Sequence, residues 1–173
     1  MLSAFSRMRF NWVRRRSLLH TPPARLPAFL RRYLEVPFPN PALAIGRASF
    51  LALDFETNGL NIEQDSILSV GSLELASSAV ELSSAWHAVV RADAPFSAGT
   101  LNEDIIPLHN ITHDMLASGQ DIKAVIEAIF TQMRGRFLLA HHADIEAGFL
   151  QAATLRHFGV HVPVAAVDTM MVE

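Results

Sequence analysis

The sequence contains no cysteine among its 173 residues. Disulfide frameworks and thiolate metal sites are therefore excluded, and the composition is consistent with a reducing compartment, so we expect a cytoplasmic location. The chain also lacks an apolar stretch long enough to cross a membrane as a helix, and no membrane partner is expected. Half of the residues are hydrophobic, which is sufficient for one sizeable domain with an appendage.

Acidic residues are missing from the first 34 positions of the chain. This segment holds eight arginines, namely Arg7, Arg9, Arg14, Arg15, Arg16, Arg25, Arg31 and Arg32. All seventeen acids follow it, together with only six Lys or Arg. This asymmetry indicates a basic arm on an acidic domain. We place the boundary near residue 46, with a basic, proline-containing arm and linker over residues 1–46 and the main domain over residues 47–173.

Three interpretations of the arm stay open. An arginine-rich, acid-free amino end resembles an organelle transit peptide. The same composition is typical of an amphipathic helix whose arginines contact phosphates. In the third interpretation a helix packs on the domain through apolar side chains, namely Trp12, Leu18, Leu19, Phe29 and Leu30.

Apolar and alternating patterns predict three strands at the start of the main domain, over residues 48–55, 65–75 and 83–92. The breaks between these strands are short and contain turn residues, Asn58-Gly59 and Ser77-Ser78. Short connections of this kind favour an antiparallel meander.

Helix and strand patterns alternate after the meander. Residues 121–133 have helical periodicity with Asp121 as a candidate N-cap, and residues 143–159 predict a helix that ends at its glycine. A short strand is predicted over residues 136–140, and a strand that turns into a helix over residues 163–173. This order indicates an α/β fold whose mixed sheet is flanked by helices.

Two carboxylates, Asp54 and Glu56, lie two positions apart at the end of the first predicted strand. Residues i and i+2 of a strand point to the same side, so both should project together while Phe55 enters the core. Two carboxylates on one side are costly unless a cation compensates them, and Mg²⁺ or Mn²⁺ prefers oxygen ligands. The alternative is a solvated strand end that carries two charges by chance.

Several segments together resemble the DEDD family of 3′→5′ exonucleases, which includes the proofreading subunit of bacterial DNA polymerase III and RNase T. "LDFETNGLN" followed by "DSILSVGSLEL" resembles the first motif, with its Asp-x-Glu-Thr. "PLHNITHDML", "LLAHHADIEAGFL" and "AVDTMMVE" resemble later segments of the family and occur in family order. The resemblance covers about residues 48–173.

The resemblance implies a ribonuclease-H-like fold and a metal-dependent 3′→5′ exonuclease that removes nucleotides from DNA ends. It implies two divalent cations, Mg²⁺ or Mn²⁺, held by Asp54, Glu56 and Glu146. The implied partner is a single-stranded 3′ end, DNA in preference to RNA, with a DNA polymerase as a further partner. The residues expected to grip the terminal nucleotide are Thr57, Leu60, His109, Ile111 and Phe149.

The second motif departs from the family pattern. A gapless alignment from Ala140 to Leu150 puts His142 at the family's asparagine and Glu146 at its aspartate. Asp144 lies two positions earlier, a helical rotation of about 200°. We therefore expect Glu146, in preference to Asp144, to be the ligand, and Asp144 to cap the helix.

The family's third motif, with a general-base histidine and a fourth carboxylate, has no match in residues 1–173, so we expect the domain to be incomplete at its carboxyl end. Asp168 belongs to the Val-Asp-Thr segment, for which we expect a structural role. Two alternatives to an active DNA exonuclease stay open. One is a catalytically impaired module that binds nucleic acid or a polymerase, and the other is an RNA 3′ exonuclease.

Overall fold

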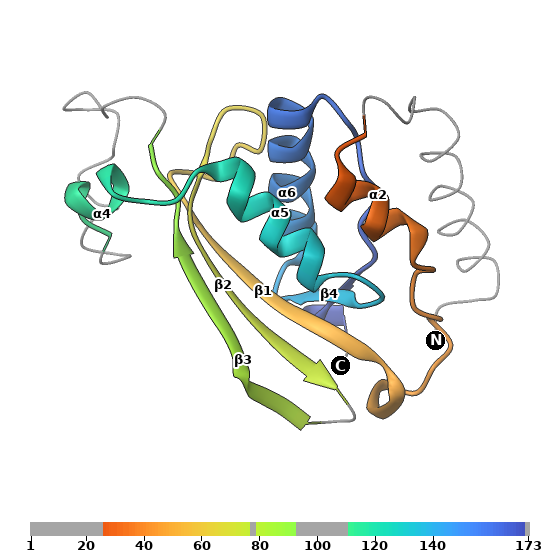
Figure 1. Cartoon of the computed structure of the whole chain (residues 1–173). Helices are drawn as coiled ribbons and strands as arrows, with labels where there is room; N and C mark the ends of the chain where they lie inside the picture. Colours follow the sequence, from red (N-terminus) through yellow and green to blue (C-terminus); the bar gives the residue numbers. More distant parts are fainter. Residues whose placement is uncertain (1–25, 77–78, 93–110, 172–173) are drawn as a thin grey trace.

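The computed structural model describes residues 26–76, 79–92 and 111–171. Five strands form one mixed sheet in the order β3-β2-β1-β4-β5 (Figure 1). Their bounds are β1 (Ser49–Thr57), β2 (Ile67–Ala76), β3 (Ala79–Val89), β4 (Phe137–Ala140) and β5 (Ala166–Asp168). Strands β1 to β3 pair antiparallel, whereas β4 and β5 pair in parallel. The predicted meander followed by parallel strands is confirmed.

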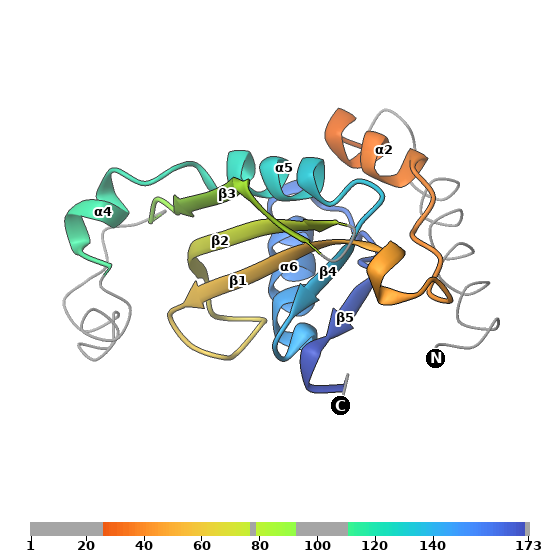
Figure 2. The same ribbon diagram turned by 90° about the horizontal axis from the view of Figure 1, so that it is seen from below.

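Three helices gather on one side of this sheet, α2 (Ala28–Glu35), α5 (Ile122–Gln132) and α6 (Ala143–Phe158) (Figures 1 and 2). The short helix α4 (His113–Ala117) lies apart from them. Two 3₁₀ turns, η1 (Ile45–Arg47) and η2 (Thr169–Met171), precede β1 and follow β5. Within the described ranges, no helix has both the length and the apolarity needed to cross a membrane.

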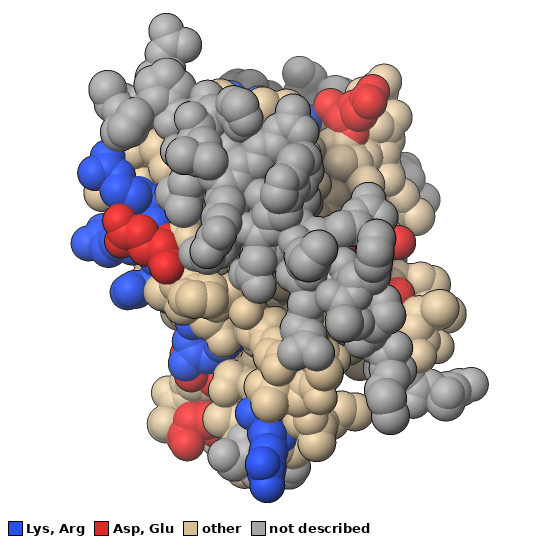
Figure 3. Space-filling model, turned by 90° about the vertical axis from the view of Figure 1, so that its right-hand side faces the viewer, with Lys and Arg blue, Asp and Glu red and all other residues tan. Residues whose placement is uncertain are grey.

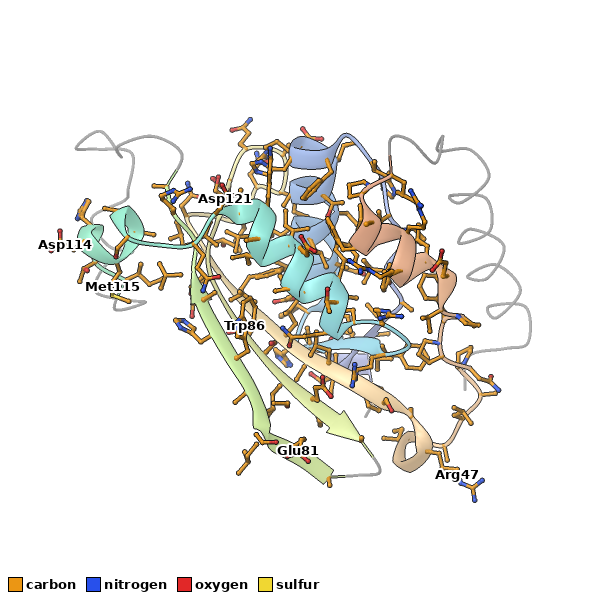
Figure 4. The ribbon with its side chains drawn as sticks, in the orientation of Figure 1. Arg47, Glu81, Trp86, Asp114, Met115 and Asp121 are labelled. Atoms are coloured by element: carbon orange, nitrogen blue, oxygen red, sulfur yellow. The ribbon has the colours of Figure 1, made fainter. Side chains whose placement is uncertain are left out.

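The two long helices begin and end where the sequence predicts. Asp121 caps α5, because its carboxylate accepts a hydrogen bond of 2.8 Å from the backbone N–H of Lys123. Gly159 terminates α6 in the left-handed conformation, with φ of 67°. Figure 4 shows Asp121 at the beginning of α5. The beginning of α5 and the end of α6 are thus set by local capping residues.

The buried face of the sheet follows the alternation of β1. Leu51, Leu53 and Phe55 are buried and belong to the main hydrophobic core. That core also contains the apolar stripe of α5, in which Val125 and Ile126 are fully buried. The alternation matters for function because it leaves the intervening positions of β1 outside the core.

Helix α2 is part of the same core. Phe29 and Leu30 are buried, as the packed-helix interpretation of the arm predicts, whereas Trp12, Leu18 and Leu19 lie outside the described residues. On the side of the molecule that carries α2, the visible Lys and Arg side chains lie beside Asp and Glu (Figure 3). The division near residue 46 stays a prediction about domain organisation.

Tyr33 joins α2 to the chain just before β5. Its side chain is 1% exposed, and its hydroxyl donates a hydrogen bond of 3.1 Å to the backbone carbonyl of Pro163. Burial raises the pKa of the Tyr33 hydroxyl, so this group stays protonated as a donor. The bond connects residues 130 positions apart in the sequence.

We predict that Tyr33→Phe lowers the free energy of unfolding by about 1–3 kcal/mol, because it leaves a buried carbonyl without a donor. Urea denaturation followed by tryptophan fluorescence measures this change. Thr131→Val is the control, since Thr131 donates to the carbonyl of Glu127 at an exposed site and its loss should cost less than about 0.5 kcal/mol. Equal costs for the two variants would contradict the prediction.

Candidate active site

Asp54 and Glu56 project from the same side of β1. Their neighbours Leu53 and Phe55 are buried in the core, whereas Asp54 is exposed and Glu56 is half-buried. The strand alternation therefore places the two carboxylates as the sequence predicts. Opposite Asp54 on β2 lies Gly71, where an added Cβ would meet nothing within 4 Å.

The space beside Asp54 is a hollow of about 580 Å³ over the sheet. Strand β3 contributes His87 to its lining, and the chain after β4 contributes His141. Because Gly71 has no side chain, the carboxylate of Asp54 borders open space instead of a packed neighbour.

Glu146 lies in the first turn of α6 and is only 6% exposed. One of its carboxylate oxygens, Oε2, is buried and has no hydrogen-bond partner in the structure. Burial raises the pKa of Glu146, and the negative charge of Asp54 raises it further, while a hydrogen bond with its own backbone lowers it in part. The charge of Asp54, on a different element, thus contributes to the raised pKa of Glu146.

Asp144, the other acidic residue of this helical turn, is not buried like Glu146. It is exposed in the first turn of α6, whereas Glu146 is buried. The expectation that Asp144 caps the helix is wrong, because the N-cap is His142 and makes no side-chain cap hydrogen bond. A carboxylate from another element, that of Asp168 on β5, accepts the His142 backbone N–H instead, at 3.1 Å.

The loop after β1 is held by its own polar groups. The Thr57 hydroxyl donates to the carbonyl of Gly59 at 2.7 Å, and the Asn61 N–H donates to the carboxylate of Asp65, also at 2.7 Å. A Cβ at Gly59 would overlap the Asp65 carboxylate, which would then have to move from its hydrogen bond with Asn61. This loop presents Leu60 to solvent with 77% of its surface exposed.

Two of the residues predicted to grip the nucleotide are buried in hydrophobic clusters. Phe149 is 2% exposed within the main core, and Ile111 is buried with Leu68 and Leu116 in a second cluster. Thr57 and Leu60 are near the carboxylates in sequence and at or near the surface. His109 lies outside the described residues.

The described residues do not bring three or more His, Asp or Glu side chains into a ready-made metal cluster. The pair of Asp54 and Glu146 nevertheless fits a hard divalent cation. Both supply carboxylate oxygens, and the buried Oε2 of Glu146 has no partner. A bound cation would satisfy that oxygen and offset the repulsion between the two charges.

The chain was compared with protein-family models and with known proteins. A family model described as "Exonuclease" (RNase_T) matches residues 51–172. The epsilon subunit of DNA polymerase III from Haemophilus influenzae is 30% identical over 105 residues, which cover 58% of this chain and 39% of that protein. The PolC-type DNA polymerase III of Thermotoga maritima is 23% identical over 125 residues, which cover 72% of this chain and 9% of that protein.

A solved structure shares the fold. Exonuclease I of E. coli in complex with a dT13 oligonucleotide superposes with a TM-score of 0.59 at 13% identity. The superposition covers 73% of this chain and 29% of that one. This chain therefore spans less than half of each of these three relatives.

We predict that Glu146→Gln stabilises the metal-free protein at pH 7, by on the order of 1 kcal/mol, because it removes a buried charge whose Oε2 has no hydrogen-bond partner. The raised pKa of Glu146 means that the folded chain binds this proton more tightly than the unfolded chain. Stability is therefore lost as the pH rises above 4.5, the usual value, through the raised pKa. The advantage of the variant should shrink below pH 4.5.

Urea denaturation in the presence of a chelator, between pH 4 and pH 8, measures this difference. Asp144→Asn is the matched control, since it removes an exposed charge from the first turn of the same helix. Its cost should be about 0.3–1 kcal/mol, the value of an acid near a helix N-terminus. A Glu146→Gln variant that is less stable than wild type at pH 7 would refute the prediction.

Proposed function

This chain belongs to the RNase_T exonuclease family, and from that premise we propose that it is a metal-dependent 3′→5′ exonuclease acting on single-stranded DNA ends. The observation that carries the proposal is the pair formed by Asp54 and Glu146. A carboxylate with an unpartnered buried oxygen lies within electrostatic reach of a second carboxylate beside an open hollow. Such perturbed pairs are typical of functional sites.

In this proposal Asp54, Glu56 and Glu146 hold two divalent cations, Mg²⁺ or Mn²⁺. When bound, such ions activate water as a nucleophile and stabilise the leaving 3′ oxygen of a phosphodiester. Asp54 would hold a cation together with Glu146, because it is the member of the β1 pair whose charge acts on Glu146. Glu56, two positions along the strand, adds a third carboxylate from the same side.

The terminal nucleotide is proposed to contact the loop after β1. Leu60 offers an exposed apolar side chain on a loop that its own hydrogen bonds hold in place. Contacts of apolar and aromatic groups with unpaired bases are tolerant of sequence, which suits a single-stranded end. Thr57 holds the loop through the carbonyl of Gly59, whereas the burial of Phe149 and Ile111 gives these residues a supporting role.

DNA is favoured as the substrate because matching relatives include DNA polymerase III proteins, and the similar exonuclease I structure contains dT13. A DNA polymerase is the proposed further partner on the same grounds. An impaired binding module is the competing function, favoured by the lack of a three-residue metal cluster among the described side chains. Such a module would bind single strands without cleaving them.

We predict that the 173-residue chain binds Mn²⁺ and that Asp54→Ala combined with Glu56→Ala abolishes this binding, because both changes remove oxygen ligands. Isothermal titration calorimetry at pH 7 measures it. Glu81→Ala is the control, since it removes a carboxylate from the exposed start of β3 (Figure 4). Equal Mn²⁺ binding by the double variant and wild type would rule out these residues as ligands.

We predict that Glu146→Gln lowers the release of the 3′-terminal nucleotide by at least about 10²-fold, because it keeps the shape and removes the charge. The assay uses the native gene product with Mg²⁺ or Mn²⁺ and a 3′-labelled single strand, as DNA and as RNA. Asp144→Asn should retain most of the activity.

The outcomes of this assay separate the competing functions. Loss of activity in Asp144→Asn but not in Glu146→Gln would mean that the alignment is shifted by two residues. Preference for the RNA strand would make the protein an RNA exonuclease. Binding of the strand without any nucleotide release would favour the impaired module.

A further inference from the structure

The turn that leads from β4 into α6 is held from outside its own segment. His142, the N-cap of α6, has φ of 63° and ψ of 52° and offers no side-chain cap. Among the described residues it is the one non-glycine with a positive φ. A residue in this conformation is strained and persists only where surrounding contacts hold it.

The holding group is the carboxylate of Asp168 at the end of β5. Its Oδ1 accepts hydrogen bonds from the backbone N–H groups of His142 at 3.1 Å and Met170 at 2.9 Å. Hydrogen bonds from Met170, and then from His142 and Ala143, hold the pKa of Asp168 below its usual value. The parallel pairing of β4 with β5 puts Asp168 opposite Ala140, beside this turn.

The next residue of the chain adds a second contact to the same turn. The Thr169 hydroxyl and Nδ1 of His141 lie 3.1 Å apart, within hydrogen-bond distance. Both residues of the turn, His141 and His142, are therefore held by two consecutive residues, Asp168 at the end of β5 and Thr169 at the start of η2.

Glu146 follows His142 by four residues, about one helical turn. Its carboxylate is buried and lacks a partner for Oε2, so no hydrogen bond of that oxygen determines where it lies. Its place relative to Asp54 depends on how α6 begins. We propose that Asp168 is a positioning residue, whose carboxylate holds the first turn of α6 from β5 and so sets the carboxylate of Glu146 against Asp54.

The proposal rests on the exonuclease function in so far as Glu146 takes part in catalysis. Asp168→Ala removes the acceptor, whereas Asp168→Asn keeps an Oδ1 that can accept from both His142 and Met170. With a single-stranded oligodeoxynucleotide and Mg²⁺, we expect Asp168→Ala to lower kcat on the order of 10–100-fold with little change in KM, since a displacement of about 1 Å can cost 10²-fold. Asp168→Asn should retain most of the wild-type activity.

Asp121→Ala is the control for lost stability alone. Asp121 caps α5 through Lys123, outside the turn before α6, so its removal should lower the urea midpoint without changing kcat. If Asp121→Ala and Asp168→Ala lower kcat equally, or if Asp168→Asn is as inactive as Asp168→Ala, the positioning role is overturned.

Two metal-free measurements test the inference even if the protein is not a nuclease. Amide hydrogen exchange of residues 142–146 should accelerate in Asp168→Ala while the last turn of α6 is unaffected. Thr169→Val, a milder change at the same turn, should accelerate the same amides to a smaller extent. It serves as the test if Asp168→Ala does not fold. Unchanged exchange in the first turn would overturn the inference whatever the activity.

The second measurement is a double-mutant cycle on the urea midpoint. If Asp168 holds Glu146 in place, the stabilisation given by Glu146→Gln should shrink in the Asp168→Ala background, where the side chain can move toward solvent. It should shrink less in the Asp168→Asn background. The negative charge of Asp168 also raises the pKa of Glu146, and both variants remove that charge. Equal shrinkage in the two backgrounds, or full additivity in both, would therefore overturn the positioning role. If the alanine background shrinks the effect more but wild type does not cleave DNA, only the exonuclease function is rejected.

Discussion

A carboxylate oxygen of Glu146 is buried without a hydrogen-bond partner, within reach of the charge on Asp54. An unpaired buried polar group costs about 1–3 kcal/mol, and a charged one costs more. The surrounding structure must therefore keep this arrangement against its tendency to relax. Strand β1 does so from one side by fixing Asp54 through the alternation that buries Leu53 and Phe55.

The other side of the pair depends on α6, and α6 depends on β5. The helix begins at a strained His142 and has no cap of its own, while the carboxylate of Asp168 accepts the N–H of His142. The core supports this geometry from behind, because Phe149 and Leu150 of α6 are buried. The energetic cost of the site is thus offset by packing that is not itself part of the site.

The family match and the burial of individual carboxylates are two independent observations on this domain. The match over residues 51–172 shows an exonuclease domain, and the fold resembles exonuclease I at 13% identity. Neither establishes which residues act in this chain. The burial of Glu146 and the exposure of Asp144 distinguish two carboxylates that lie two positions apart on one helix.

Several features of this protein follow from local chemistry and could be predicted from the residues alone. Alternation set the sides of Asp54 and Phe55, Asp121 capped α5, and Gly159 ended α6, because each depends on neighbours within a few residues. Other features depend on contacts between segments far apart in the sequence, and local patterns do not predict them. Asp144 was predicted as a cap, but Asp168, from a strand 26 residues away, holds that turn. The burial of Phe149, the raised pKa of Glu146 and the contact of Tyr33 with Pro163 likewise arise only when distant segments pack together.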